Sequence, residues 1–301
     1  MSTDDKKPRI AIYYDNRYGR NDGPPLYYWN QMKKLGMDVH HFIPEGDITK
    51  KYGKFDLHFW VDWGEDALGL TNWEIPDDGG KKIYVASDTH LDDGYRLRKA
   101  EKYDFVYFNQ KRAFEEYKSK PGQGVGWLLH AFEPMAYDKQ EILKKYDVCF
   151  IGHVQEQPSF NGFSRTEFLD RMFKEFPNFY FGTRMPGFPA HNMFEDAALK
   201  FSKSKIVLNI SAKDDINMRV FETLGTGGFL LTNWIPTINE VFKEGVHLVT
   251  YKTLDEAVEK AKYYLEHDDE REAIAEAGYQ EAHTHHKYEN RIKDIMASLS
   301  L

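Results

Sequence analysis

The stretch DDINMRVFETLGTGGFLLTN, residues 214–233, gathers polar side chains beside one short helical pattern. Four of them can bind a ligand or react: Asp214, Asn217, Arg219 and Glu222. A carboxylate accepts hydrogen bonds from two vicinal hydroxyls, and an arginine beside helix N–H groups attracts a diphosphate. We therefore expect a site for a ligand with hydroxyl and phosphate groups. The alternative is an N-capped amphipathic helix with surface charges.

We expect the helix itself to run from Ile216 to Gly225, with Asp215 as its N-cap. Its core face would hold Val220, Phe221 and Leu224, which places the candidate ligand-binding side chains off that face. The glycines that end the pattern would let the chain turn into a strand and let a ligand approach closely.

Two further loops carry candidate groups. Asp88 and His90 stand two apart at the end of an apolar run, so both can face the same side. The alternative for His90 is a solvated residue in a capped loop. In the second loop, Gly152 follows another apolar run and leads to a helix that starts near Ser164, with Arg165 beside it. A helix N-terminus after a glycine-bearing loop favours phosphate binding.

The elements that must position these residues alternate between short apolar runs and longer helical patterns, which is typical of an α/β protein with parallel sheets. We expect strands at 8–15, 37–44, 55–62, 81–88, 103–109, 146–152, 179–183, 205–211, 228–233 and 246–251. The pattern restarts after a proline-broken connection near 130–148. The sequence thus predicts domains at 1–135 and 136–284, with an amphipathic C-terminal helix from 285–301 returning to the first.

Composition excludes several classes of protein. A formal net charge of −8 over 301 residues argues against a protein that coats nucleic acid. The single cysteine, Cys149, allows no internal disulfide, and the chain shows neither a signal peptide nor an apolar run long enough to span a bilayer. We expect a cytoplasmic protein.

Cofactor motifs are also missing from the sequence. There is no Gly-x-Gly-x-x-Gly and no Walker A pattern, and no Asp-x-Asp that would hold a metal-bound diphosphate. The histidines His283, His285 and His286 have no cysteine or carboxylate at zinc-ligand spacing. We expect no metal site and no cofactor.

Residues 146–295 resemble the C-terminal half of GT-B glycosyltransferases, in particular the CgeB-like (spore maturation protein-like) branch. The resemblance rests on YDVCFIG, SKIVLNIS, NMRVFETLGTGGFLLTN and the run that begins at INEVFKEG. The first half is similar more loosely, through VASDTHL, FNQKRAFEEY and WLLHAFEP. The resemblance implies two Rossmann-like domains that face a cleft and a C-terminal helix that packs back on the first domain. It also implies that the second domain binds a nucleotide-sugar donor.

The resemblance also assigns roles to residues. Related retaining enzymes have two acids eight apart, and here Asp214 and Glu222 stand at that spacing, with aspartate in place of the first glutamate. It implies that Glu222 binds the ribose and that Asn217 and Arg219 contact the donor. The basic pair that those relatives use for the diphosphate is not cleanly present in this sequence. The candidate for that role is Arg165, with Lys205 or Arg184 behind it.

We therefore expect a hexosyltransferase that takes a sugar from a nucleotide-sugar, a UDP-sugar before others, without a metal and with retention. Asp88, His90 and Asp214 are the expected catalytic residues. The acceptor stays open among a glycan, a protein, a small molecule and a modified base. The alternatives are a ligand-binding protein without chemistry, a sugar-nucleotide epimerase or phosphorylase on the same fold, and a degenerate scaffold member.

Overall fold

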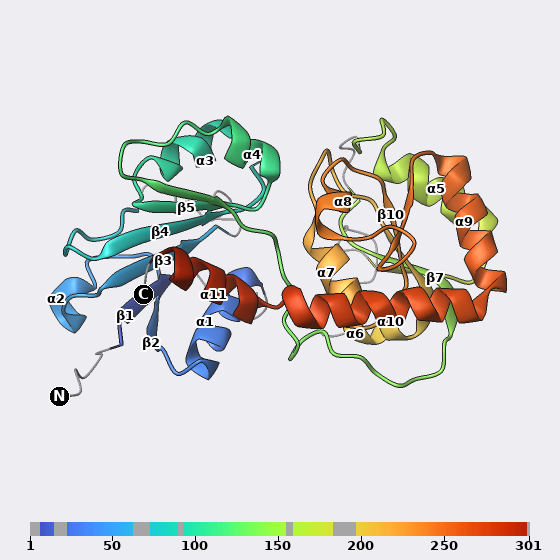
Figure 1. Cartoon of the computed structure of the whole chain (residues 1–301), viewed down its shortest axis with the longest axis horizontal. Coiled ribbons are helices and arrows are strands. Elements are labelled where there is room, and N and C mark those ends of the chain that lie inside the picture. Colours follow the sequence, from blue (N-terminus) through green and yellow to red (C-terminus); the bar gives the residue numbers. More distant parts are fainter. Residues whose placement is uncertain are drawn as a thin grey trace. The chain divides into compact units, whose positions relative to one another are not determined.

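A computed structural model describes residues 7–14, 23–62, 73–89, 93–154, 159–182 and 197–299. The chain divides into two compact units (Figure 1). Unit 1 comprises Met1–Leu129 and Tyr288–Leu301, and unit 2 comprises His130–Lys287. The sequence had placed these divisions at 135/136 and 284/285. Each unit has its own parallel sheet with helices packed on it, so the predicted α/β fold with two parallel-sheet domains is confirmed.

The sheet of unit 1 has the order β2-β1-β3-β4-β5-β6, and its neighbouring strands are parallel. Every residue of its central strand β3 is buried, as expected for an apolar run between two other strands and two helical layers. The strands are β1 (Arg9–Tyr13), β2 (Asp38–Phe42), β3 (Leu57–Val61), β4 (Lys81–Ala86), β5 (Phe105–Phe108) and β6 (Gly124–Trp127).

Helices cover both faces of this sheet (Figure 1). On one face α1 (Pro24–Lys34) packs against α11 (Tyr288–Ser298), and the Tyr28 and Tyr288 rings meet edge to face with centroids 5.0 Å apart. On the other lie α3 (Asp93–Ala100) and α4 (Lys111–Glu116), whose Ala100 and Ala113 join the core. A short helix, α2 (Thr49–Tyr52), precedes β3. The C-terminal helix therefore packs on the first domain, as the sequence predicted.

Unit 2 has a sheet of the order β11-β10-β9-β7-β8, again with parallel neighbours. Its middle strand β9 continues from α6 and ends at a buried asparagine, a point to which the site below returns. The strands are β7 (Tyr146–Ile151), β8 (Phe179–Gly182), β9 (Ser204–Asn209), β10 (Leu230–Asn233) and β11 (Val249–Tyr251).

The helices of unit 2 also form two layers (Figure 1). One layer holds α5 (Arg165–Glu175) and α9 (Leu254–Glu266), which begin at side-chain caps from Ser164 and Thr253. The other holds α6 (Ala197–Ser202), α7 (Met218–Gly225) and α10 (Asp268–His285); α8 (Ile238–Val241) follows β10. This arrangement places α7 between the sheet and α10.

Some elements were not foreseen. The strand β6 is the glycine-rich run GVGW, whose composition carries little strand signal, and α3 follows Asp92 without a clear apolar period. Among the described helices, none is long and apolar enough to cross a membrane.

Candidate functional site

The carboxyl ends of β7, β9 and β10 meet at one edge of the sheet in unit 2, where α7 begins. Ligands of open parallel sheets bind at this edge. Five residues there interact with one another directly or through their charges: Gly152, Arg165, Asn209, Asn217 and Arg219. We call them the donor-edge cluster.

Asn209 is the centre of the cluster. It is fully buried at the end of β9. Its Oδ1 accepts hydrogen bonds from Asn217 Nδ2 at 3.1 Å and from Arg219 Nη1 at 2.9 Å. Its Nδ2 donates to Thr232 Oγ1 at 2.9 Å, which fixes the orientation of the amide. The sheet thus holds the first turn of α7 through one side chain. One sequence signal points to Asn209, namely a polar residue at the end of the apolar run KIVLN.

Arg219 lies across the end of β7. Its Cζ is 4.6 Å from the centroid of the Phe150 ring, and its Nη2 passes over Gly152. Burial, followed by the charge of Arg165, lowers the pKa of Arg219 to about 10, although Glu222 opposes the change. Among the described residues its only hydrogen bond is the one to Asn209. Within the described residues, Arg219 is therefore a poorly solvated cation, and most of its N–H donors are available at the carboxyl edge.

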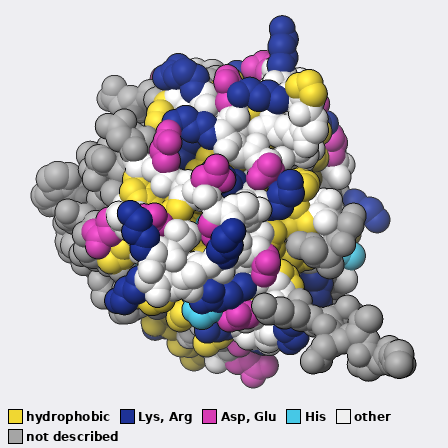
Figure 2. Space-filling view, turned by 90° about the vertical axis from the view of Figure 1, so that its left-hand side faces the viewer, with side chains coloured by type: hydrophobic (Ala, Val, Ile, Leu, Met, Phe, Trp, Pro, Cys, Tyr) yellow, Lys and Arg dark blue, Asp and Glu magenta, His cyan; other side chains and the backbone are white. Residues whose placement is uncertain are grey.

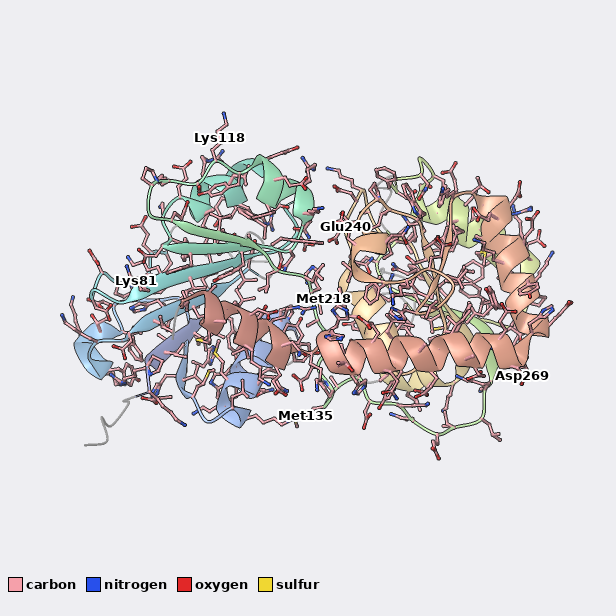
Figure 3. All side chains as sticks on the ribbon, viewed as in Figure 1. Lys81, Lys118, Met135, Met218, Glu240 and Asp269 are labelled. Atoms are coloured by element: carbon pink, nitrogen blue, oxygen red, sulfur yellow. The ribbon has the colours of Figure 1, made fainter. Side chains whose placement is uncertain are left out.

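The helix α7 begins two residues later than the sequence predicted. Met218, labelled in Figure 3, is its first residue, and Asn217, with φ −71° and ψ 166°, is the N-cap in place of Asp215. The Asn217 side chain does not cap the helix because its amide is held by Asn209. Asp215 is buried, and its charge acts on Arg165 instead. The uncapped first turn leaves helix N–H groups for an anion.

Glu222 is buried, with 7% of its surface exposed, although the helical pattern places it off the core face of α7. The helix α7 lies between the sheet and α10, so little of its surface remains open to solvent. The charge of Glu222 raises the pKa of Arg219, one turn earlier. A Cβ on Gly225 would lie 2.3 Å from the Phe132 ring, so this glycine admits an aromatic side chain and not a ligand.

Arg165 is the first residue of α5, but its guanidinium also ties two loops together. Nη1 donates to the carbonyl of His153 at 2.8 Å, and Nε and Nη2 donate to that of Ile210 at 3.2 and 3.1 Å. Burial lowers the pKa of Arg165, while Asp215 opposes this. It therefore acts as a fixed positive charge near Arg219. Of the other two diphosphate candidates, Lys205 pairs with Asp147 at 3.6 Å near the start of β9, and Arg184 lies outside the described residues.

Asp214 is not part of the donor-edge cluster. It is partly exposed in the loop between β9 and α7, beside Lys213 with its positive φ of 48°. In the part of the chain that the structure describes, it makes none of the hydrogen bonds that join Asn209, Asn217 and Arg219.

In unit 1, Asp88 is partly exposed beyond the carboxyl end of β4, with a positive φ of 52°. Burial raises the pKa of its carboxyl, and the charge of Arg96 opposes that change. Arg96 Nε in turn donates to Asp62 Oδ2 at 2.6 Å, at the end of β3. The sequence prediction missed this buried pair, although Asp62 ends an apolar run as Asp88 does. His90 lies outside the described residues.

Over the ranges that the structure describes, no group of three or more histidine, cysteine, aspartate or glutamate side chains is arranged to hold a metal ion. The arrangement in unit 2 is instead a cationic one. Arg219, the fixed charge of Arg165 and the start of α7 together suit a ligand with two or more negative charges.

The chain was compared with known protein families, curated sequences and solved structures. The sequence model of a family described as "Glycosyl transferase-like" matches residues 165–297. No curated protein sequence matches the chain. Among solved structures, HepE from Anabaena is similar with a TM-score of 0.65 and 13% identity over 97% of this chain and 99% of that one. The chain has the GT-B fold.

Two other solved structures show the same likeness over both units. Sucrose-phosphate synthase from Thermosynechococcus elongatus has a TM-score of 0.65 and 11% identity, over 97% of this chain and 99% of its own. The β-glucosyltransferase of phage T4 has a TM-score of 0.62 and 14% identity, over 97% and 100%. The narrower assignment to the CgeB-like branch stays a prediction.

Proposed function

We propose that this protein is a glycosyltransferase that takes its sugar from a nucleotide-sugar, with a UDP-sugar as the favoured donor. The observation that carries the proposal is Arg219, a poorly solvated guanidinium with available donors at the carboxyl edge of unit 2, beside the uncapped start of α7. A diphosphate supplies the negative charge and the acceptor oxygens that this arrangement lacks.

The chemistry follows from where charge develops. When the bond between sugar and diphosphate breaks, negative charge grows on the leaving phosphate. This growing charge is stabilised by Arg219, by the fixed charge of Arg165 and by the N–H groups of α7. These groups therefore stabilise the transition state more strongly than they stabilise the bound donor before the bond breaks. Because Asn209 holds Arg219 in place before the donor binds, little reorganisation is needed during the reaction. We assign Glu222 to the ribose hydroxyls and Asn217 to the donor.

The identity of the donor rests on proteins of the same fold. HepE was solved with UDP and glucose and with UDP-glucose, and the phage T4 enzyme with uridine diphosphoglucose as its substrate. We propose that the present chain uses its cationic cluster where other enzymes use a metal-bound diphosphate, so that transfer is metal-independent. We assign the acceptor side to unit 1, with Asp88 and His90 as the groups that assist the acceptor hydroxyl. Retention is the expected outcome, with Asp214 near the transferred sugar.

A thermal-shift screen of nucleoside diphosphates and their sugars tests the proposal. A ligand at about 100 times its dissociation constant stabilises the folded state by about 2.7 kcal/mol. We expect UDP and UDP-sugars to raise the melting temperature of the wild type. Mass spectrometry of the same mixtures should show release of UDP from the preferred sugar donor. If no nucleotide or nucleotide-sugar stabilises the chain, the proposed function is wrong.

A further inference from the structure

Unit 1 has a pocket of about 340 Å³ between α3 and the segment that leads into β4. Its charged lining is mostly basic: Lys82, Arg98, Lys99 and Lys102 stand against one acid, Glu74. The lining thus carries three more positive than negative charges. No residue of the donor-edge cluster belongs to it. A pocket of this size can enclose a small molecule.

The one acid of the pocket is already paired. Lys102 Nζ lies 2.5 Å from Glu74 Oε1. Neither Lys82 nor Arg98 makes an ion pair with any residue that the structure describes. Lys99 is 8% exposed, and its Nζ lies 3.7 Å from the centroid of the Trp60 ring. Two cations without an ion-pair partner among the described residues are therefore available to an anion in the pocket, together with the buried charge of Lys99.

The rest of the lining is aromatic or apolar. Trp73, Tyr95 and Tyr103 contribute rings, and the buried side chain of Ile75 completes that part of the wall. Rings beside cations bind a flat group through stacking, while the cations bind its charge. The pocket thus suits a ligand that has both features.

The charge pattern on unit 1 argues for a compact ligand. Figure 2 shows basic and acidic side chains interspersed over the face of unit 1 that it draws, without a continuous basic stripe. Two lysines outside the pocket have acidic partners, with Lys81 3.8 Å from Asp104 and Lys120 3.4 Å from Glu101. A long polyanion would extend to these acidic side chains and be repelled by them, whereas a small molecule bound inside the pocket would not reach them.

We propose that this pocket binds an aryl phosphate, a compact dianion that carries a flat ring. A phosphate matches the excess of positive charge better than a singly charged carboxylate does, because it neutralises two cations at once. The inference is independent of the proposed function, since the pocket shares no residue with the donor-edge cluster.

Calorimetry with phenyl phosphate on the full chain tests this, with inorganic phosphate and phenol as partial ligands. Phenyl phosphate should bind more tightly than either partial ligand. The Arg98→Ala variant should bind it at least about tenfold more weakly, since a charged hydrogen bond is worth about 1.5–3 kcal/mol. Arg98 is exposed, so the fold should survive, and circular dichroism checks this. Arg112→Ala, on α4, removes a matched arginine outside the pocket.

Three results would overturn the inference. The first is that the wild type does not bind phenyl phosphate, and the second is that Arg98→Ala and Arg112→Ala lose affinity for it equally. The third is that saturating UDP displaces phenyl phosphate completely. The last would show that the ligand occupies the nucleotide site instead. Unchanged phenyl phosphate binding in the presence of UDP, together with loss in Arg98→Ala alone, would establish a separate pocket.

Discussion

Arg219 Nη2 lies 1.9 Å from the point where a Cβ atom on Gly152 would stand, and its Cζ lies 2.9 Å from that point. No side chain at position 152 is compatible with this place for the guanidinium. The positions of Gly152, at the end of β7, and Arg219, on α7, therefore depend on each other. Because Gly152 has no side chain, the guanidinium of Arg219 can reach the carboxyl edge of the sheet.

Replacement of Gly152 by alanine should displace Arg219 and weaken UDP binding about 10- to 100-fold, since charge-assisted hydrogen bonds are worth about 1.5–3 kcal/mol. The Gly152→Ala and Arg219→Ala changes should be non-additive, because both remove the same contact. Calorimetry on the two single variants and the double variant measures this. Gly182→Ala is the matched control at the end of the next strand, where a Cβ would lie 3.2 Å from the Ile151 side chain. Full additivity would show that the two residues act separately.

Glu222→Gln tests the ribose assignment while it keeps the volume of a buried side chain. If Glu222 accepts the ribose hydroxyls, the variant should lose about tenfold or more in affinity for UDP and much less for 2′-deoxy-UDP. If Glu222 acts through its charge on Arg219, both affinities should fall by the same factor. Calorimetry with the two nucleotides separates these results, and equal losses would remove Glu222 from the ribose site.

Chelation tests metal independence. We expect transfer from a UDP-sugar to persist after treatment with EDTA, because protein cations already stand where the diphosphate is proposed to bind. The assay is release of UDP before and after dialysis against the chelator. Complete loss of release, restored by Mn²⁺ or Mg²⁺ alone, would contradict the prediction.

His247 should make the stability of unit 2 depend on pH. Burial lowers the pKa of His247 from its usual 6.5, although Glu281 opposes this. The unfolded chain then takes up protons at a higher pH than the folded one. The stabilising contribution is present above about pH 6.5 and is lost as the pH falls through the lower folded value.

Urea unfolding followed by circular dichroism, at several values between about pH 7.5 and about pH 5.5, measures this dependence. His247→Gln should show a smaller loss of unfolding free energy on acidification than the wild type. His267→Gln, at an exposed histidine of the same unit, is the control and should behave as the wild type does. Identical slopes for His247→Gln and the wild type would remove this residue as the cause.

Much of the architecture was readable from the sequence because apolar runs and glycine or proline punctuation report local structure directly. The strand runs and the C-terminal helix follow from that pattern. Only some residues of the candidate site could be predicted from the sequence. Arg219 and Asn217 stood out by type, but the role of Asn209 depends on which strand ends beside α7. The packing of α10 on α7 joins segments about fifty residues apart, and no local pattern contains that contact.

The most direct measurement of the central claim is UDP binding by Arg219→Ala compared with Arg171→Ala. Arg171 is an arginine of the same unit on α5, where it pairs with Asp255 at 3.0 Å on the surface. We predict that Arg219→Ala loses about 10- to 100-fold in affinity while Arg171→Ala keeps that of the wild type, with both variants folded. Wild-type affinity for UDP in a folded Arg219→Ala protein would contradict the donor site described for α7.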